Sequence, residues 1–152
     1  MLHAMIEQRD NAEDELIAAV AFTLAQRPEV GAAYLYGSVA KGRATPLSDI
    51  DVAIVAANGV APTVRGALLR DLSVDLARAR PGAVFDVRFL DELPVSVRGR
   101  VVTEGRRLLD RDSSCRLEAE VRARMEYHDF LIFEREGVRE GMRGLREAVR
   151  GG

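Results

Sequence analysis

One stretch of the chain decides its fold: YGSVAKGRATPLSDIDVAIV, residues 36–55. The apolar run Ala32–Tyr36 predicts a buried strand that ends at Gly37. Asp49–Ala57 predicts a second strand, and Gly37–Pro46 predicts a loop or a short helical turn between the two. This connection is too short for a crossover helix between parallel strands, which disfavours a Rossmann arrangement.

Two aspartates stand at the start of the second predicted strand. Asp49 and Asp51 are two residues apart, so their side chains point to the same face of a strand, about 7 Å apart. Two carboxylates on one face repel each other unless a cation lies between them. A pair of divalent ions about 3.5–4 Å apart fits this spacing and suits an in-line phosphoryl displacement. Ile50 and Val52 point the other way, into the core, so the aspartates predict a rigid metal site.

The turn before these aspartates has the features of a phosphate-binding loop. Gly37-Ser38 follows the first strand directly, and backbone N–H groups at such a turn are free to bind an anion. Glycine lets a phosphate approach closely, and the Ser38 hydroxyl adds a donor. The spacing from Gly37 also fits a Walker A loop, but Arg43 and Ala44 stand where that motif needs Lys and Ser/Thr. We therefore reject a P-loop and infer nucleotide chemistry at a metal site.

The composition narrows the class of protein. The 152 residues predict a single domain, residues 1–152, with a C-terminal helical tail at about 112–150. A net charge of −2 disfavours binding of nucleic acid through a basic surface. Two histidines and one cysteine leave too few ligands for a zinc site of the usual kind. Any metal is therefore expected to have oxygen ligands, with magnesium or manganese the first choices.

The cellular location is predicted from three features. Residues 1–15 carry five acidic side chains, unlike a secretory signal peptide. The longest apolar run, Ile17–Ala25, is too short to span a bilayer. The lone Cys115 fits a reducing compartment. These features predict a soluble, cytoplasmic protein.

The remaining segments predict further helices and strands. Apolar periodicity predicts helices at Asn11–Gln26 and Thr63–Arg80, and Ala83–Leu90 predicts a third strand. Val97–Leu109 is ambiguous and fits a helix followed by a short strand at Arg106–Leu109.

A long C-terminal helix is predicted from about residue 112, with Ser113 or Ser114 as its N-cap. Its spacing predicts an inward-facing stripe, in which the histidine is a core or interface residue: Leu117, Val121, Met125, His128 and Ile132. Each glycine costs about 1 kcal/mol against alanine in a helix, so a break or fraying is expected at Gly137, Gly141 and Gly144. The run Phe130–Phe133 is more apolar than one helix face can bury, so part of it is expected at the surface, where a partner can dock.

The stretch at 36–55 resembles the signature of the DNA polymerase β-like nucleotidyltransferase superfamily. It is most similar to the minimal nucleotidyltransferase (MNT) family, of the MntA antitoxin type found in HEPN/MNT toxin–antitoxin pairs, whose pattern is G-S-x-A-R-G followed by S-D-I/L-D-L/F. Residues 37–42 read GSVAKG and residues 48–52 read SDIDV, with Lys41 in place of the commoner arginine. The resemblance implies the α/β fold of that superfamily: a small mixed β-sheet with flanking helices on one side, plus a long C-terminal helix.

The resemblance also implies the residues of the site. The family uses a third carboxylate on a later strand, which Asp86 supplies here, with Asp91 and Glu92 at the strand end as weaker alternatives. The implied catalytic and metal-binding residues, which would hold two Mg²⁺ ions, are Asp49, Asp51 and Asp86. The implied residues for binding the ATP substrate are Gly37, Ser38, Lys41, Gly42 and Ser48.

The implied function is a magnesium-dependent transfer of AMP from ATP to a hydroxyl, most simply a tyrosine, of a cognate HEPN RNase toxin. The modification would neutralise the toxin, and the two proteins would form a hetero-oligomer, with no role for a membrane or for direct nucleic-acid binding. Two alternatives stay open. One is a non-catalytic antitoxin that acts by binding alone. The other is a small-molecule nucleotidyltransferase of the aminoglycoside-modifying type, for which the chain has little spare length. A polymerase is disfavoured by the size and by the lack of a basic channel.

Overall fold

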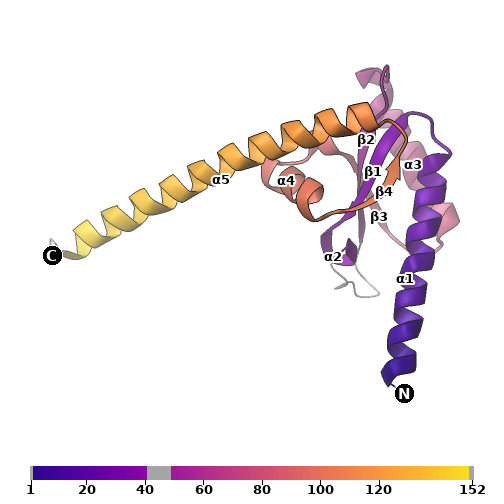
Figure 1. Cartoon of the computed structure of the whole chain (residues 1–152), viewed down its shortest axis with the longest axis horizontal. Coiled ribbons are helices and arrows are strands. Elements are labelled where there is room, and N and C mark those ends of the chain that lie inside the picture. Colours follow the sequence, from indigo (N-terminus) through magenta and orange to yellow (C-terminus); the bar gives the residue numbers. More distant parts are fainter. Residues whose placement is uncertain (1, 41–48, 151–152) are drawn as a thin grey trace.

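A mixed sheet organises the chain, and in the described residues it has four strands in the order β3-β2-β1-β4 (Figure 1). The computed structural model describes residues 2–40 and 49–150, with side chains described from Ala12 to Glu147 apart from Val39 and the gap. The strands are β1 Val30–Tyr36, β2 Ile50–Ala56, β3 Phe85–Phe89 and β4 Arg106–Asp110.

The direction of each strand follows from the length of its connection. β1 is antiparallel to β2 because only a short segment, which begins with the one-turn helix α2 (Gly37–Ala40), joins them. β2 is parallel to β3 because the 3₁₀ turn η1 (Pro62–Val64) and helix α3 (Arg65–Ala79) cross back between them. β4 returns to pair antiparallel with the other edge of β1. The arrangement is not a Rossmann sheet, as predicted.

The helices agree with the predicted segments, with shifted ends. α1 spans Leu2–Ala25 and starts earlier than predicted. After the 3₁₀ turn η2 (Leu90–Glu92), the ambiguous segment forms helix α4 (Val95–Glu104) and then β4, the order that was predicted. The last helix, α5, spans Ser113–Arg150. In the part of the chain that is described, no helix combines the length and the apolar character needed to cross a membrane.

Helices cover both faces of the sheet, which corrects the prediction of helices on one side. On β2, Ile50, Val52 and Ile54 belong to a core shared with α1 and α3, whereas Ala53 and Val55 belong to a second core shared with α4 and α5. Because β1 and β2 are buried on both sides, they read as continuous apolar runs rather than as an alternating pattern. Such runs are what a sheet between two helical layers requires.

Helix α5 packs on the body through a different face from the predicted one. The stripe from Leu117 to Ile132 is exposed, and the His128 side chain is 75% exposed, so the prediction that this stripe is buried is wrong. The contact with α4 uses Tyr127 and the small Ala123 instead. Gly99 of α4 makes room for it, since a Cβ there would lie 2.0 Å from Cγ of Tyr127. Helical spacing identifies an apolar stripe but not whether another element covers it.

The far part of α5 projects from the sheet as one arm of the molecule, and the start of α1 projects as another (Figure 1). α5 is continuous through its three glycines, so the expected break is absent. Phe130 stacks on Tyr127, with ring centroids 6.4 Å apart, and is half-buried. Ile132 and Phe133 are exposed. Part of the run 130–133 is therefore at the surface, as predicted.

A polar network ties the first turns of α5 to the sheet. Asp112, rather than a serine, caps the helix, because its Oδ1 accepts a hydrogen bond from the backbone N–H of Cys115 at 3.1 Å. Glu120 is only 8% exposed, accepts a hydrogen bond from the Tyr34 hydroxyl of β1, and lies 3.0 Å from Nη1 of Arg116. Burial opposes the ionisation of Glu120, but the hydrogen bonds from Tyr34 and Arg116 outweigh it and lower its pKa. The network keeps a buried negative charge paired.

We predict that Glu120→Gln lowers the free energy of unfolding by about 1–3 kcal/mol at neutral pH, because Arg116 loses its buried counter-charge. Because the folded-state pKa of Glu120 is lowered, its stabilisation is complete above the ordinary value of 4.5 and is lost as the pH falls through the folded-state value. Urea unfolding over this pH range measures the effect. The matched control, Glu118→Gln, removes an exposed ion pair with Arg122 and should cost less than about 0.5 kcal/mol. Equal losses in the two variants would contradict a stabilising role for the network.

Candidate active site

Three side chains stand in one row across the sheet. Tyr36 at the end of β1 pairs with Asp51 of β2, and Asp51 pairs with Asp86 of β3. Residues directly opposite each other on neighbouring strands point to the same face. Because Ile50 and Val52 point into the core under α1 and α3, the row lies on the face that carries α4 and α5. The predicted third carboxylate therefore lies beside Asp51.

Asp49 completes an anionic cluster at this edge of the sheet. It comes directly before β2 and is exposed. Burial raises the pKa of Asp51 above its ordinary value of 3.8, and the negative charges of Asp86 and Asp49 raise it further. Each neighbouring carboxylate thus opposes the ionisation of Asp51, and a cation bound nearby would favour its charged form.

Gly37 brings the main chain against the Asp51 carboxylate. Its φ of 73° lies in the left-handed region, and a Cβ at this position would lie 2.1 Å from Oδ2 of Asp51. Glycine meets both demands because it has no side chain. Gly37 and Ser38 also open α2, the predicted short helical turn, and the first N–H groups of a helix have no partner within it. The turn that was predicted to bind phosphate therefore lies against the Asp51 carboxylate.

Two residues that were not predicted from the sequence belong to this site. Arg88, two residues after Asp86 on β3, has its Nε 3.0 Å from Oδ1 of Asp86. Burial raises the pKa of the Tyr36 hydroxyl to about 12, and the charges of Asp51 and Asp86 contribute. A signal for both existed in the sequence: strand alternation places Arg88 on the face of Asp86, and Tyr36 directly precedes the Gly37 turn.

The donor atoms suit a hard divalent cation but do not form a closed cage. Mg²⁺ prefers oxygen ligands and is usually held by one or two carboxylates together with substrate phosphates and water. Among the described side chains, no group of three or more Asp, Glu, His or Cys residues is close enough to hold an ion unaided. Asp51 and Asp86 therefore fit a metal whose remaining ligands come from a bound triphosphate, with Asp49 beside them.

Among the described residues, the two weaker candidates for the third carboxylate lie away from the row. Three of the predicted nucleotide-binding residues lie outside the described residues: Lys41, Gly42 and Ser48. Asp91 and Glu92, the weaker candidates for the third carboxylate, follow the far end of β3 and pair with Arg65, whose Nη1 is 2.8 Å from Oδ2 of Asp91. Asp86, near the start of β3, is the acidic residue of that segment that reaches the site.

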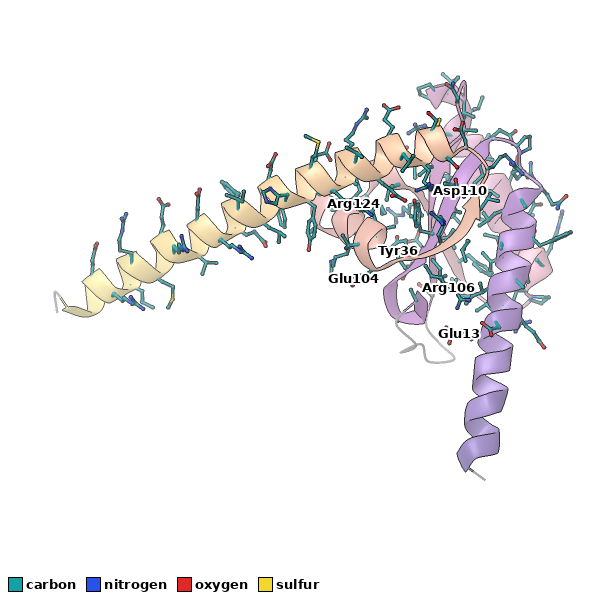
Figure 2. All side chains as sticks on the ribbon, viewed as in Figure 1. Glu13, Tyr36, Glu104, Arg106, Asp110 and Arg124 are labelled. Carbon is teal, nitrogen blue, oxygen red and sulfur yellow. The ribbon has the colours of Figure 1, made fainter. Side chains whose placement is uncertain are left out.

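A pocket of about 170 Å³ adjoins the row between α2 and α4. Tyr36 and Gly37 line one side, and α4 lines the other with Arg100 and Glu104; Figure 2 shows Tyr36 and Glu104 at this end of the sheet. A second pocket of similar volume lies at the opposite end of this face, where Cys115 and Asp91 line it, and it does not include Asp51 or Asp86. Small-molecule sites typically measure about 300–1,000 Å³, so the described residues do not enclose both a nucleotide and an acceptor.

A family model described as polymerase beta, nucleotidyltransferase, matches residues 19–114. The chain belongs to this nucleotidyltransferase family. The matched region contains the row of Tyr36, Asp51 and Asp86, the Gly37 turn and all four described strands, whereas nearly all of α5 follows it. No curated protein matches the chain.

Solved structures that share the fold are toxin–antitoxin complexes. One, a toxin–antitoxin with AMP-PNP, has a chain 24% identical to this one, with a TM-score of 0.60, covering 84% of this chain and 98% of its own. A second, a tri-AMPylated Shewanella oneidensis HEPN toxin with MNT antitoxin, gives 21% identity, a TM-score of 0.52, and coverage of 89% and 98%. A third, a mutant MntA–HpeT complex, gives 25%, 0.53, and coverage of 80% and 92%. These similarities confirm the predicted polymerase β-like fold.

We predict that Gly37→Ala disrupts the site more than the fold. A left-handed alanine costs about 1–2 kcal/mol, and the new Cβ also displaces the Asp51 carboxylate. Gly59→Ala is the matched control, because Gly59 has φ of 83° but no atom within 4 Å of an added Cβ. Both variants should lose about 1–2 kcal/mol of unfolding free energy in urea, whereas calorimetry should show loss of Mg–ATP binding only in Gly37→Ala. Normal binding by Gly37→Ala would argue that Asp51 does not hold the ligand.

Asp51→Asn is predicted to leave the metal-free protein as stable as the wild type or more so. The raised pKa of Asp51 means that its charge destabilises the folded protein, fully above the folded-state pKa and not at all well below the ordinary 3.8. The advantage of the asparagine in melting temperature should therefore disappear as the pH is lowered. Added Mg–ATP should raise the melting temperature of the wild type by mass action but raise that of Asp51→Asn much less. Asp129→Asn, an exposed carboxylate on α5, is the control and should respond like the wild type.

Proposed function

We propose that this chain is a magnesium-dependent protein adenylyltransferase, an antitoxin that transfers AMP from ATP to a tyrosine hydroxyl of a cognate HEPN toxin and thereby neutralises it. The observation that carries the proposal is the register of β2 and β3, which places Asp51 beside Asp86 and against the Gly37 turn. The family match and the AMP-PNP and AMPylated toxin of the similar structures support nucleotide chemistry at this site.

In the proposed reaction, each group of residues in the site has a separate role. Gly37 and Ser38 bind the phosphates through backbone N–H groups and the Ser38 hydroxyl, with Lys41, Gly42 and Ser48 as further predicted contacts. Asp49, Asp51 and Asp86 would hold two Mg²⁺ ions, which would neutralise charge on the triphosphate and the departing pyrophosphate. Asp86 takes the proton of the acceptor hydroxyl. The acceptor oxygen bonds to the α-phosphorus, the bond from that phosphorus to the bridging oxygen breaks, and pyrophosphate leaves.

The acceptor in this proposal comes from another protein. The pocket beside the row measures only about 170 Å³, so a small acceptor would have few walls to hold it. A protein supplies both the hydroxyl and the surface that positions it. Exposed apolar side chains of α5, among them Ile132 and Phe133, offer contact area for such a partner. One of the similar structures contains a HEPN toxin beside an MNT antitoxin, which favours a toxin as the acceptor. Two other expectations stay predictions: that residues 1–152 form a single domain, and that the protein is cytoplasmic.

Two alternatives have different predictions at the same site. The charges of Asp86 and Asp49 oppose the ionisation of Asp51. A non-catalytic antitoxin would have no use for carboxylates placed so close together. A small-molecule nucleotidyltransferase needs a wall for its acceptor, which the described residues do not provide beside the row. Both observations favour the adenylyltransferase.

The proposal requires a HEPN protein encoded beside this chain, and the test combines that protein with the purified chain and Mg–ATP. Intact-mass spectrometry should show the HEPN protein gaining whole adenylyl units, and its RNase activity should fall in step. Asp49→Ala with Asp51→Ala should abolish the mass increase, whereas Asp129→Asn should not. If the double variant neutralises the partner fully and the wild type adds no adenylyl mass, the antitoxin acts by binding alone. If AMP is added to an aminoglycoside and not to the partner, the small-molecule alternative is correct.

A further inference from the structure

Arg88 contacts the candidate site, although the proposed reaction gives it no role. Its Nε lies 3.0 Å from Oδ1 of Asp86, in a hydrogen bond that is also an ion pair. The two residues are two apart on β3, so they share a face of the sheet. The partner of Arg88 on β2 is Ala53, whose small side chain leaves the guanidinium free to lie along the strand toward Asp86.

The hydrogen bond from Arg88 restrains one carboxylate oxygen of Asp86 and does not involve the other. The hydrogen bond is made to Oδ1, so Oδ2 remains for a further ligand. Both side chains are partly exposed, 43% for Asp86 and 58% for Arg88. Among the described side chains, the hydrogen bond from Arg88 is the contact that bears on the orientation of the Asp86 carboxylate.

Carboxylates that bind metals are commonly held by a second residue, whose loss typically lowers metal affinity about 10–100-fold. We propose that Arg88 is a positioning residue, whose Nε–H holds Oδ1 of Asp86 so that Oδ2 is presented to a divalent cation shared with Asp51. The inference rests on the metal site of the proposed function and adds to it the residue that orients one ligand.

If Arg88 acted through its charge alone, removing it would have the opposite effect on cation binding. Arg88 is positive, so it repels a cation bound nearby, and its removal would strengthen cation binding if charge were its only effect. Orientation of Asp86 predicts that removal weakens cation binding. The sign of the change therefore distinguishes the two roles.

The experiment uses Mn²⁺ alone as the probe, with the full chain and no nucleotide, and measures free Mn²⁺ by electron paramagnetic resonance. Arg88→Ala should weaken Mn²⁺ binding by about 10–100-fold. Arg88→Gln keeps an N–H that can donate to Asp86 but removes the charge, so its affinity should stay within about threefold of the wild type or exceed it. The control, Arg78→Ala, removes an exposed arginine from the last turn of α3 and should change nothing.

A double-variant cycle links the effect to Asp86. With Asp86→Asn already present, Arg88→Ala should cause no further loss, because the group that it orients is gone. Melting curves of all variants check that each is folded. Mn²⁺ binding by Arg88→Ala as tight as the wild type's, or tighter, would refute the positioning role while the metal site stands. A wild-type chain that binds no Mn²⁺ would refute the metal site, and the role of Arg88 with it.

Discussion

The pairing of Asp51 with Asp86 across two parallel strands is the constraint on which the rest of this structure depends. Two like charges on neighbouring strands repel, and the pKa of Asp51 is raised by burial first and then by the charges of Asp86 and Asp49. The restraint on this pairing comes from the opposite face of the sheet, where Val52 pairs with Val87 and Ile54 with Phe89 in the core under α1 and α3. A shift of one residue in either strand would turn carboxylates into this core. Hydrophobic burial on one face thus fixes the electrostatics of the other.

The second face is organised differently, because it has to leave part of the sheet open. α4 and α5 cover the middle of β1 and β2, through Val101, Val102 and Ala123, but the row that contains Asp51 stays only partly buried at the strand ends. The Tyr34–Glu120 hydrogen bond anchors α5 two residues along β1 from Tyr36. The same strand therefore positions both the helical layer that completes the fold and the partly exposed row beside it.

Local sequence signals were sufficient for the parts of this structure that depend on neighbouring residues. The Gly37 turn and the strand that begins beside Asp49 rest on short-range patterns, and the choice of Asp86, which pairs with Asp51, rests on a resemblance carried by one stretch. The layer arrangement could not be predicted in this way, because a strand buried on both faces has the same apolar composition whichever helices cover it. The prediction that the exposed stripe of α5 faces inward failed for a related reason. The face of α5 that packs on the body is the one with Tyr127, whose packing depends on Gly99, and Gly99 belongs to another helix. Arg88 was missed because an arginine on a strand is ordinarily a solvated residue: strand alternation places it on the face of Asp86 but does not show that the two side chains pair.

The position of β4 has a consequence for how the chain is made. Ala33 of the central strand β1 pairs on one side with Ile54, which follows closely, and on the other with Leu109, which is synthesised much later. Until β4 emerges from the ribosome, β1 therefore has one unpaired edge, and its residues are almost all apolar. An apolar strand with a free edge is a template for pairing with other chains. A product that ends before Arg106 would consequently be a source of aggregation rather than a smaller folded domain, although it would contain every aspartate of the site.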